Sequence, residues 1–78
     1  MEIEKLDLHG MRHEDARREV IRFIERFWNE PKELEIITGH SVIMKGIVIN
    51  VIIEYDLPYH VGRMFEANGP RIITWTCF

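Results

Sequence analysis

Apolar and polar positions alternate near the start of the chain and then change to helical spacing. Leu6 and Leu8 flank Asp7, and because side chains along a strand alternate between its faces, this pattern predicts a short strand that buries both leucines. From residue 16 onward, apolar residues recur every three or four positions, which is typical of one face of a helix. That face carries Ala16, Val20, Phe23, Ile24 and Phe27. Pro31 ends the predicted helix.

A second strand and a second helix follow at the centre of the chain. Residues 34–37, Leu-Glu-Ile-Ile, predict a short strand that ends at Thr38-Gly39, where a glycine permits a sharp turn. Ser41 is a residue type that caps helices, and apolar residues recur at helical spacing over 47–55, before Leu57-Pro58. The same segment is rich in β-branched residues, which suit a buried strand equally well on propensity. Its length and the Ser41 cap favour a helix.

The C-terminal part of the chain predicts a hairpin. Residues 60–66 and 71–76 are separated by Asn68-Gly69, a dipeptide that favours a tight turn between two strands. The predicted order is strand, helix, strand, helix, strand, strand, and a right-handed crossover makes the first two strands parallel neighbours. We therefore expect a two-layer α/β sandwich. With 78 residues, the chain has room for one core, and residues 1–78 are expected to form a single domain.

Charge and cysteine content narrow the range of functions. The formal net charge is -3, which argues against a general nucleic-acid binder and restricts any such contact to a local basic site. Cys77 is the only cysteine, so no internal disulfide and no thiolate metal cage are expected, and a reducing compartment fits best. No run of about 20 apolar residues and no secretion signal is evident. We expect a cytoplasmic monomer without contact to membranes.

The first strand ends in residues that suit proton transfer. Asp7 and His9 point to the same face of the strand, and Gly10 permits a tight turn directly after them. An imidazole titrates near neutral pH, and a neighbouring carboxylate can orient it and stabilise its charged form. The alternative is a hydrogen-bonded surface turn without chemistry.

The second loop has the features of an anion site. Residues 38–41 follow a strand and open a helix, so backbone N–H groups and the helix dipole would face an incoming phosphate. An ordinary strand-to-helix turn explains the same residues. Because both loops lie at the carboxyl ends of strands joined by one crossover, we expect them to lie side by side. The predicted site consists of Asp7, His9, Gly10, Thr38, Gly39, His40 and Ser41, with Arg12, His13 and Lys45 as nearby cations.

A metal site is not predicted. His9 and His13 are four residues apart, but Gly10 makes a continuous helix through both improbable, so the pair is not placed to bind zinc. No cofactor is expected either.

The sequence resembles the Smr (small MutS-related) domain family. The family's Leu-Asp-Leu-His-Gly motif is complete at residues 6–10, and its Thr-Gly loop after the second strand is present at Thr38-Gly39. The resemblance covers nearly the whole chain in element order. It implies a fold similar to the C-terminal domain of bacterial translation initiation factor three, and an association with DNA nicking or, in several members, RNA endonuclease activity.

One loop departs from the family pattern. The family's Asp-x-His positions fall on Asp7 and His9, and the first glycine of its Gly-x-Gly loop falls on Gly39, but the second glycine is missing. Either Ser41 replaces it, or the loop is shortened so that His40-Ser41 matches a His-Ser pair found slightly later in many members. Ser41 adds a side chain where a glycine lets the backbone approach a substrate closely.

Two functions are compatible with these residues. The first is binding and metal-independent cleavage of nucleic acid, RNA rather than DNA, in which Asp7 orients His9 for proton transfer. In this scheme backbone N–H groups at Gly39 and Ser41 hold the phosphate, and His40 is a second acid-base group. The second is a binding module for nucleic acid, a ribosome or a recruiting protein that performs no chemistry.

Overall fold

The chain folds in the order strand, helix, strand, helix, strand, strand, as the sequence predicts. The computed structural model describes residues 2–62 and 70–76. Its elements are β1 (Glu2–Asp7), α1 (His13–Arg26), β2 (Lys32–Ile37), α2 (Val42–Glu54), β3 (Tyr59–Val61) and β4 (Arg71–Trp75). The central segment is a helix and not a strand, which resolves the ambiguity of its β-branched residues.

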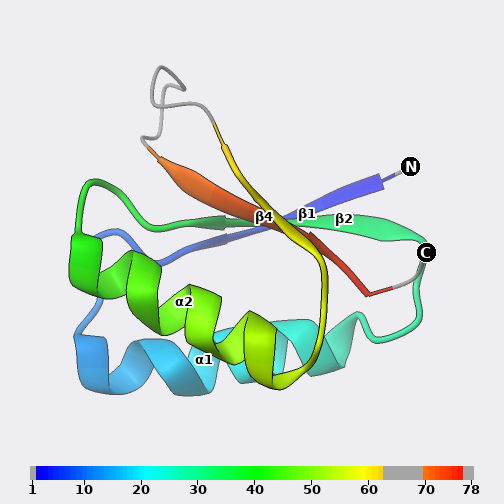
Figure 1. The fold of residues 1–78 in the computed structure, drawn as a ribbon, viewed down its shortest axis with the longest axis horizontal. Coiled ribbons are helices and arrows are strands. Elements are labelled where there is room, and N and C mark those ends of the chain that lie inside the picture. Colours follow the sequence, from blue (N-terminus) through cyan, green and yellow to red (C-terminus); the bar gives the residue numbers. More distant parts are fainter. Residues whose placement is uncertain (1, 63–69, 77–78) are drawn as a thin grey trace.

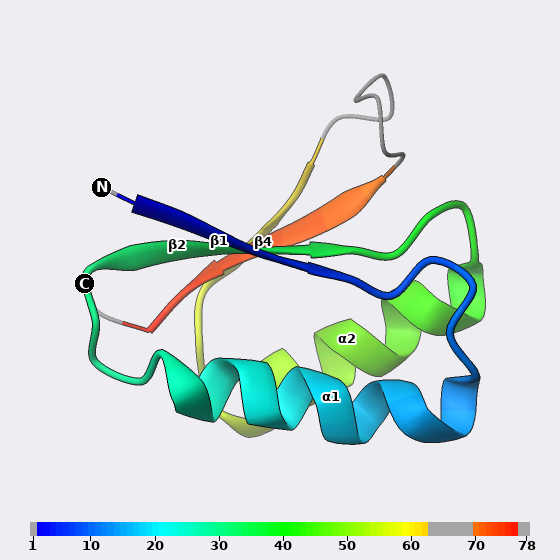
Figure 2. The ribbon, with the colours of Figure 1, turned by 180° about the vertical axis from the view of Figure 1, so that it is seen from behind.

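The four strands form one mixed sheet in the order β1-β2-β4-β3. β1 runs parallel to β2, whereas β4 is antiparallel to both β2 and β3. Both helices lie on one side of this sheet, with α2 nearer the viewer in Figure 1 and α1 nearer in Figure 2. The predicted two-layer α/β sandwich is therefore confirmed, and the parallel pair places the ends of β1 and β2 at the same edge.

The C-terminal hairpin is present, and its first strand, expected over 60–66, is β3 at Tyr59–Val61, while residues 63–66 lie outside the described residues. β3 pairs antiparallel with β4, and Val61 lies opposite Ile72. A two-residue turn at Asn68-Gly69 continued along both strands would instead bring Val61 opposite Thr76. The described strands do not have that register, and Asn68-Gly69 itself lies outside the described residues.

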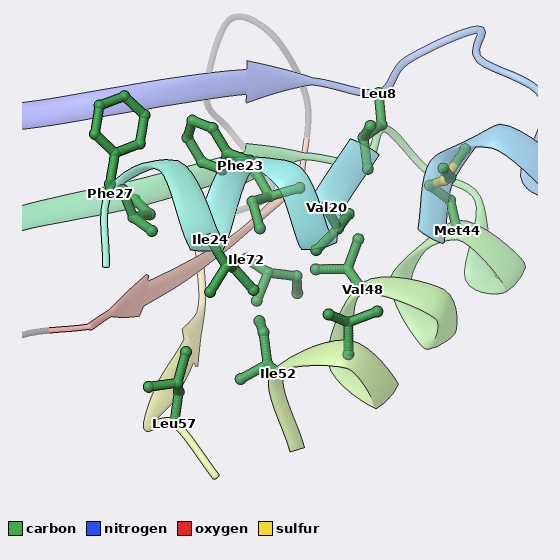
Figure 3. Close-up of a cluster of buried hydrophobic side chains, with 14 residues drawn as sticks. Leu8, Val20, Phe23, Ile24, Phe27, Met44, Val48, Ile52, Leu57 and Ile72 are labelled. Atoms are coloured by element: carbon green, nitrogen blue, oxygen red, sulfur yellow. The ribbon is translucent and has the colours of Figure 1, made fainter. Parts of the chain in front are cut away.

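The core lies between the sheet and the two helices (Figure 3). Leu8 is fully buried at the end of β1, whereas Leu6 is only partly buried. The predicted stripe of α1 is buried along its length, and its Phe23 and Phe27 rings meet edge to face at 5.4 Å. α2 contributes buried Met44, Val48, Val51 and Ile52. Buried side chains of both helices thus pack against the sheet and hold the end of β1 in place.

An ion pair joins the two helices on their outer side. The Arg17 guanidinium donates to both carboxylate oxygens of Glu54, each at 2.7 Å. This hydrogen-bonded pair lowers the pKa of the Glu54 carboxyl below its ordinary value.

Neither helix is long and apolar enough to cross a membrane, a finding that covers the described part of the chain.

Candidate functional site

The loops after β1 and β2 lie side by side at one end of the molecule, as Figure 2 shows. The parallel pairing extends one residue beyond β1, because the Leu8 N–H donates to the carbonyl of Ile37, the last residue of β2, at 2.8 Å. One residue further on, the His9 ring lies against Gly39, so that a Cβ atom placed on Gly39 would come within 3.2 Å of His9 Cδ2. The crossover connection predicted this contact between the two loops.

Each loop turns at a glycine with a left-handed backbone. Gly10 has φ +82° and Gly39 has φ +70°, a region that residues with a Cβ atom adopt only at a cost. The two positions differ in their surroundings, because a Cβ on Gly10 would meet nothing within 4 Å. Gly39 is therefore required for its conformation and for the approach of His9, and Gly10 for its conformation alone.

Asp7 has a different partner from the one expected. Its Oδ1 accepts a hydrogen bond from the backbone N–H of His9 at 2.9 Å, an arrangement that aspartate favours when it stabilises its own turn. The carboxylate thus holds the loop that carries His9, and in this structure it does not orient the imidazole. The His9 side chain is exposed.

The donors of Thr38 and Gly39 are used within the fold. The N–H groups of both residues donate to the Pro70 carbonyl, at 3.0 and 3.2 Å, and the buried Thr38 hydroxyl reaches the same oxygen at 3.1 Å. The expectation that Thr38 and the Gly39 N–H hold a phosphate is therefore corrected: they anchor the loop to the residue before β4. Pro70 is 32 positions away from Thr38, so local sequence did not reveal this partner.

The start of α2 offers the donors that Gly39 does not. Ser41 caps the helix, its Oγ accepting from the Met44 N–H at 3.1 Å. The N–H groups of Ser41, Val42 and Ile43 have no hydrogen-bond partner among residues 2–62 and 70–76. First-turn N–H groups point out of the helix, where the dipole favours an anion. Val42 and Ile43 were not among the predicted site residues. They could have been found from the sequence, because the first turn of any helix leaves its N–H groups without partners in the helix.

The missing second glycine does not distort this loop. Ser41 has φ -71° and ψ 118°, an extended conformation that any residue adopts. Whichever alignment of the loop is taken, the backbone at this position does not require a glycine. The serine side chain turns to the helix as its cap and leaves the free N–H groups in place.

The predicted cations lie around the two loops, although not all in one cluster. Gly10, Arg12 and His13 line a shallow open depression where α1 begins, and the exposed Arg12 pairs with Glu14 at 3.4 Å. His40 is exposed directly after Gly39, and Lys45 lies partly buried within α2. No group of three or more metal-binding side chains occurs in the part of the chain that the structure describes.

Fold and loops together define a small α/β domain with two loops side by side at one edge of its sheet. The sequence model of the Smr domain matches residues 6–62, more than half of the chain, so the protein belongs to the Smr domain family. The matched range begins at Leu6 of the Leu-Asp-Leu-His-Gly motif and includes both loops. The Smr domain is known as a nucleic-acid-binding, nuclease-like domain. No curated protein and no solved structure matches the chain.

Proposed function

We propose that this Smr domain binds RNA across the two loops and cleaves its backbone without a metal ion. The observation that carries the proposal is the packing of the His9 ring against Gly39. Gly39 lies two residues before Ser41, where the free N–H groups of α2 begin. An imidazole and a set of anion-binding donors therefore occupy neighbouring positions on one edge of the molecule.

Binding relies on the start of α2. A backbone phosphate accepts hydrogen bonds from the N–H groups of Ser41, Val42 and Ile43, and the helix dipole adds to the attraction. Arg12 and Lys45 supply positive charge nearby. Because so few cations are involved, the slope of log affinity against log salt concentration should be shallow, about -1.4 for two charges on a single strand.

Cleavage uses His9 and His40, both of which are exposed. His9 takes the proton of the ribose 2′-hydroxyl as its oxygen attacks the adjacent phosphorus, and protonated His40 gives a proton to the departing 5′-oxygen. The products are a 2′,3′-cyclic phosphate and a 5′-hydroxyl end. The N–H groups of α2 stabilise the charge that develops on the phosphate oxygens. Asp7 acts as a positioning residue, because it holds the turn that presents His9.

A cleavage assay with matched histidine variants tests the proposal. Labelled single-stranded and hairpin RNA are incubated with the protein in a metal chelator, and fragments are separated by size. We expect His9→Ala to lower the cleavage rate about 100-fold or more, the scale of general acid-base catalysis. His60→Ala removes an exposed histidine on β3 and should cut at the parent rate. Equal rates for His9→Ala and the parent protein would refute the catalytic role.

A second candidate is a binding module that performs no chemistry. It is favoured by Asp7, which bonds the His9 backbone and not the imidazole. A module of this kind would dock on RNA, a ribosome or a recruiting protein through the same free donors. It predicts salt-sensitive RNA binding without RNA cleavage fragments.

A 2′-deoxy substitution at the cut position of the RNA distinguishes attack by the ribose 2′-hydroxyl from hydrolysis by water. Hydrolysis by water would also permit DNA nicking.

A further inference from the structure

A buried ion pair joins β2 to β4 on the face of the sheet that the helices do not cover. Arg71 Nη1 donates to Glu35 Oε1 at 2.8 Å, and the two residues are only 5% and 8% exposed. Their side chains point away from the helices, because the neighbouring residues Leu34, Ile36 and Ile72 are buried in the core. Burying two charges offsets much of the energy of their attraction, so stability alone does not explain this pair.

Arg71 is also held by the chain directly after β3. Its backbone carbonyl accepts a hydrogen bond from the Gly62 N–H at 2.8 Å. The stem of the Arg71 side chain passes so close to Gly62 that a Cβ placed there would come within 2.6 Å of Arg71 Cγ. Glu35 on one side and Gly62 on the other therefore fix the position of Arg71.

The position of Arg71 fixes the carbonyl of the residue before it. A peptide bond is planar, so the Pro70 carbonyl and the Arg71 Cα lie in one rigid plane. Pro70 is itself fully buried, and its ring restricts the backbone on the other side of that plane. The direction of the Pro70 carbonyl thus follows from where Glu35 and Gly62 hold Arg71.

The Pro70 carbonyl is the anchor of the β2–α2 loop. It accepts hydrogen bonds from the N–H groups of Thr38 and Gly39 at 3.0 and 3.2 Å, and from the Thr38 hydroxyl at 3.1 Å. The His9 ring lies against Gly39, where a Cβ would be 3.2 Å from His9 Cδ2. A displacement of the Pro70 carbonyl therefore moves Gly39 and changes the surface on which His9 rests.

We infer that Glu35 and Arg71 are positioning residues for His9, acting through Pro70 and Gly39. The inference rests on the proposed function, since it takes His9 as the group that accepts the proton. RNA is held in that proposal by N–H groups at the start of α2, and these do not bond to Pro70 in the described part of the chain. The pair should therefore set the rate of cleavage and leave RNA affinity largely unchanged.

Two substitutions disturb the pair from opposite sides. Glu35→Gln keeps the shape of the side chain and removes the charge that holds Arg71. Gly62→Ala leaves both charges in place, and its new methyl group displaces the Arg71 stem. Ile24→Val is the matched control, because it lowers stability by removing one buried methyl group of α1. Circular dichroism checks that each variant is folded.

Hydrogen exchange and NMR of the full chain report the position of the loop without RNA. In both pair variants, the two amides that bond to Pro70 should exchange about 10-fold faster relative to the Val20 amide of α1. The signal of the His9 Cδ2 proton should shift as well. The control should show neither change, because a general loss of stability speeds the exchange of core amides at least as much as that of a loop.

Cleavage kinetics give a second readout that a purely structural role would not change. Labelled RNA is incubated with each variant in a metal chelator, and kcat and KM are measured separately. In Glu35→Gln, kcat should fall about 10-fold, since a small misplacement of a catalytic group slows the chemical step. KM should stay within about 2-fold of the parent value, because the groups that bind RNA are unchanged.

The outcomes separate this inference from the proposed function. Parent-like exchange at Thr38 and Gly39 in both pair variants would overturn the inference, as would equal changes in the Ile24→Val control. A weaker RNA affinity with an unchanged kcat would also overturn it. A parent protein that does not cut RNA refutes the proposed function alone, because the exchange rates and the His9 signal still decide whether the pair positions the loop.

Discussion

Replacing Gly39 by alanine tests two roles of this residue in the β2–α2 loop: its left-handed backbone conformation and the space that it leaves for the His9 ring. Gly39 has φ +70°, and its missing Cβ leaves room for the His9 ring. The left-handed conformation costs an alanine about 1–2 kcal/mol. At a separation of 3.2 Å from His9 Cδ2, the new methyl group would also displace the ring by a few tenths of an ångström. His9 is exposed and moves without disturbing the core.

Gly10→Ala is the matched control for this substitution. Gly10 has φ +82°, so alanine there carries a similar backbone cost, but its methyl group would meet nothing within 4 Å. Both variants should lose about 1–2 kcal/mol of stability, which corresponds to a fall in Tm of about 4–16 °C for a domain of this size. Only Gly39→Ala should change the position of the His9 ring relative to α2.

Two measurements distinguish the variants. Thermal unfolding gives the backbone cost, and the NMR shift of the His9 Cδ2 proton reports the ring environment. We expect similar Tm values, a larger His9 shift in Gly39→Ala and a greater loss of RNA cleavage in that variant. Equal His9 shifts in the two variants, with equal cleavage, would refute the claim that Gly39 positions His9.

Three further substitutions test other parts of the structure. Gly46→Ala should raise the free energy of unfolding by about 0.5–1 kcal/mol, because the position is helical with open space at the Cβ, and a denaturant titration at low concentration of protein measures it. Arg71→Met removes the 2.8 Å partner of buried Glu35 and should cost about 3 kcal/mol in the same titration; an unchanged midpoint would contradict the importance of this pair. Arg17 lowers the Glu54 pKa in the folded state, so its stabilisation is present above the unfolded value of about 4.3 and is lost as the pH falls through the folded pKa. Glu54→Gln should therefore reduce stability at pH 7 and converge with the parent in acid, as unfolding curves at several pH values would reveal.

Local patterns were sufficient for the architecture. The apolar stripe of α1, the Ser41 cap and the two glycine turns each depend on residues close in sequence, and each appears where it was expected. The contact between the two loops also followed from sequence, because a right-handed crossover brings the ends of two parallel strands to one edge.

Hydrogen-bond partners at the site could not be predicted in the same way. Thr38 and Gly39 bond to Pro70, which only the return of β4 beside β2 brings near. Asp7 has both the His9 backbone and the His9 ring within its sequence neighbourhood, and spacing alone does not decide between them.

An NMR titration with a cleavage-resistant RNA shows whether the two loops form one binding site. A short 2′-O-methyl oligonucleotide is added to the labelled full chain, and each backbone amide is followed. We expect the amides of His9, in the β1–α1 loop, and of Val42 and Ile43, at the start of α2, to shift together with one dissociation constant. Shifts confined to one of the two loops, or found only at other surfaces, would contradict a shared site.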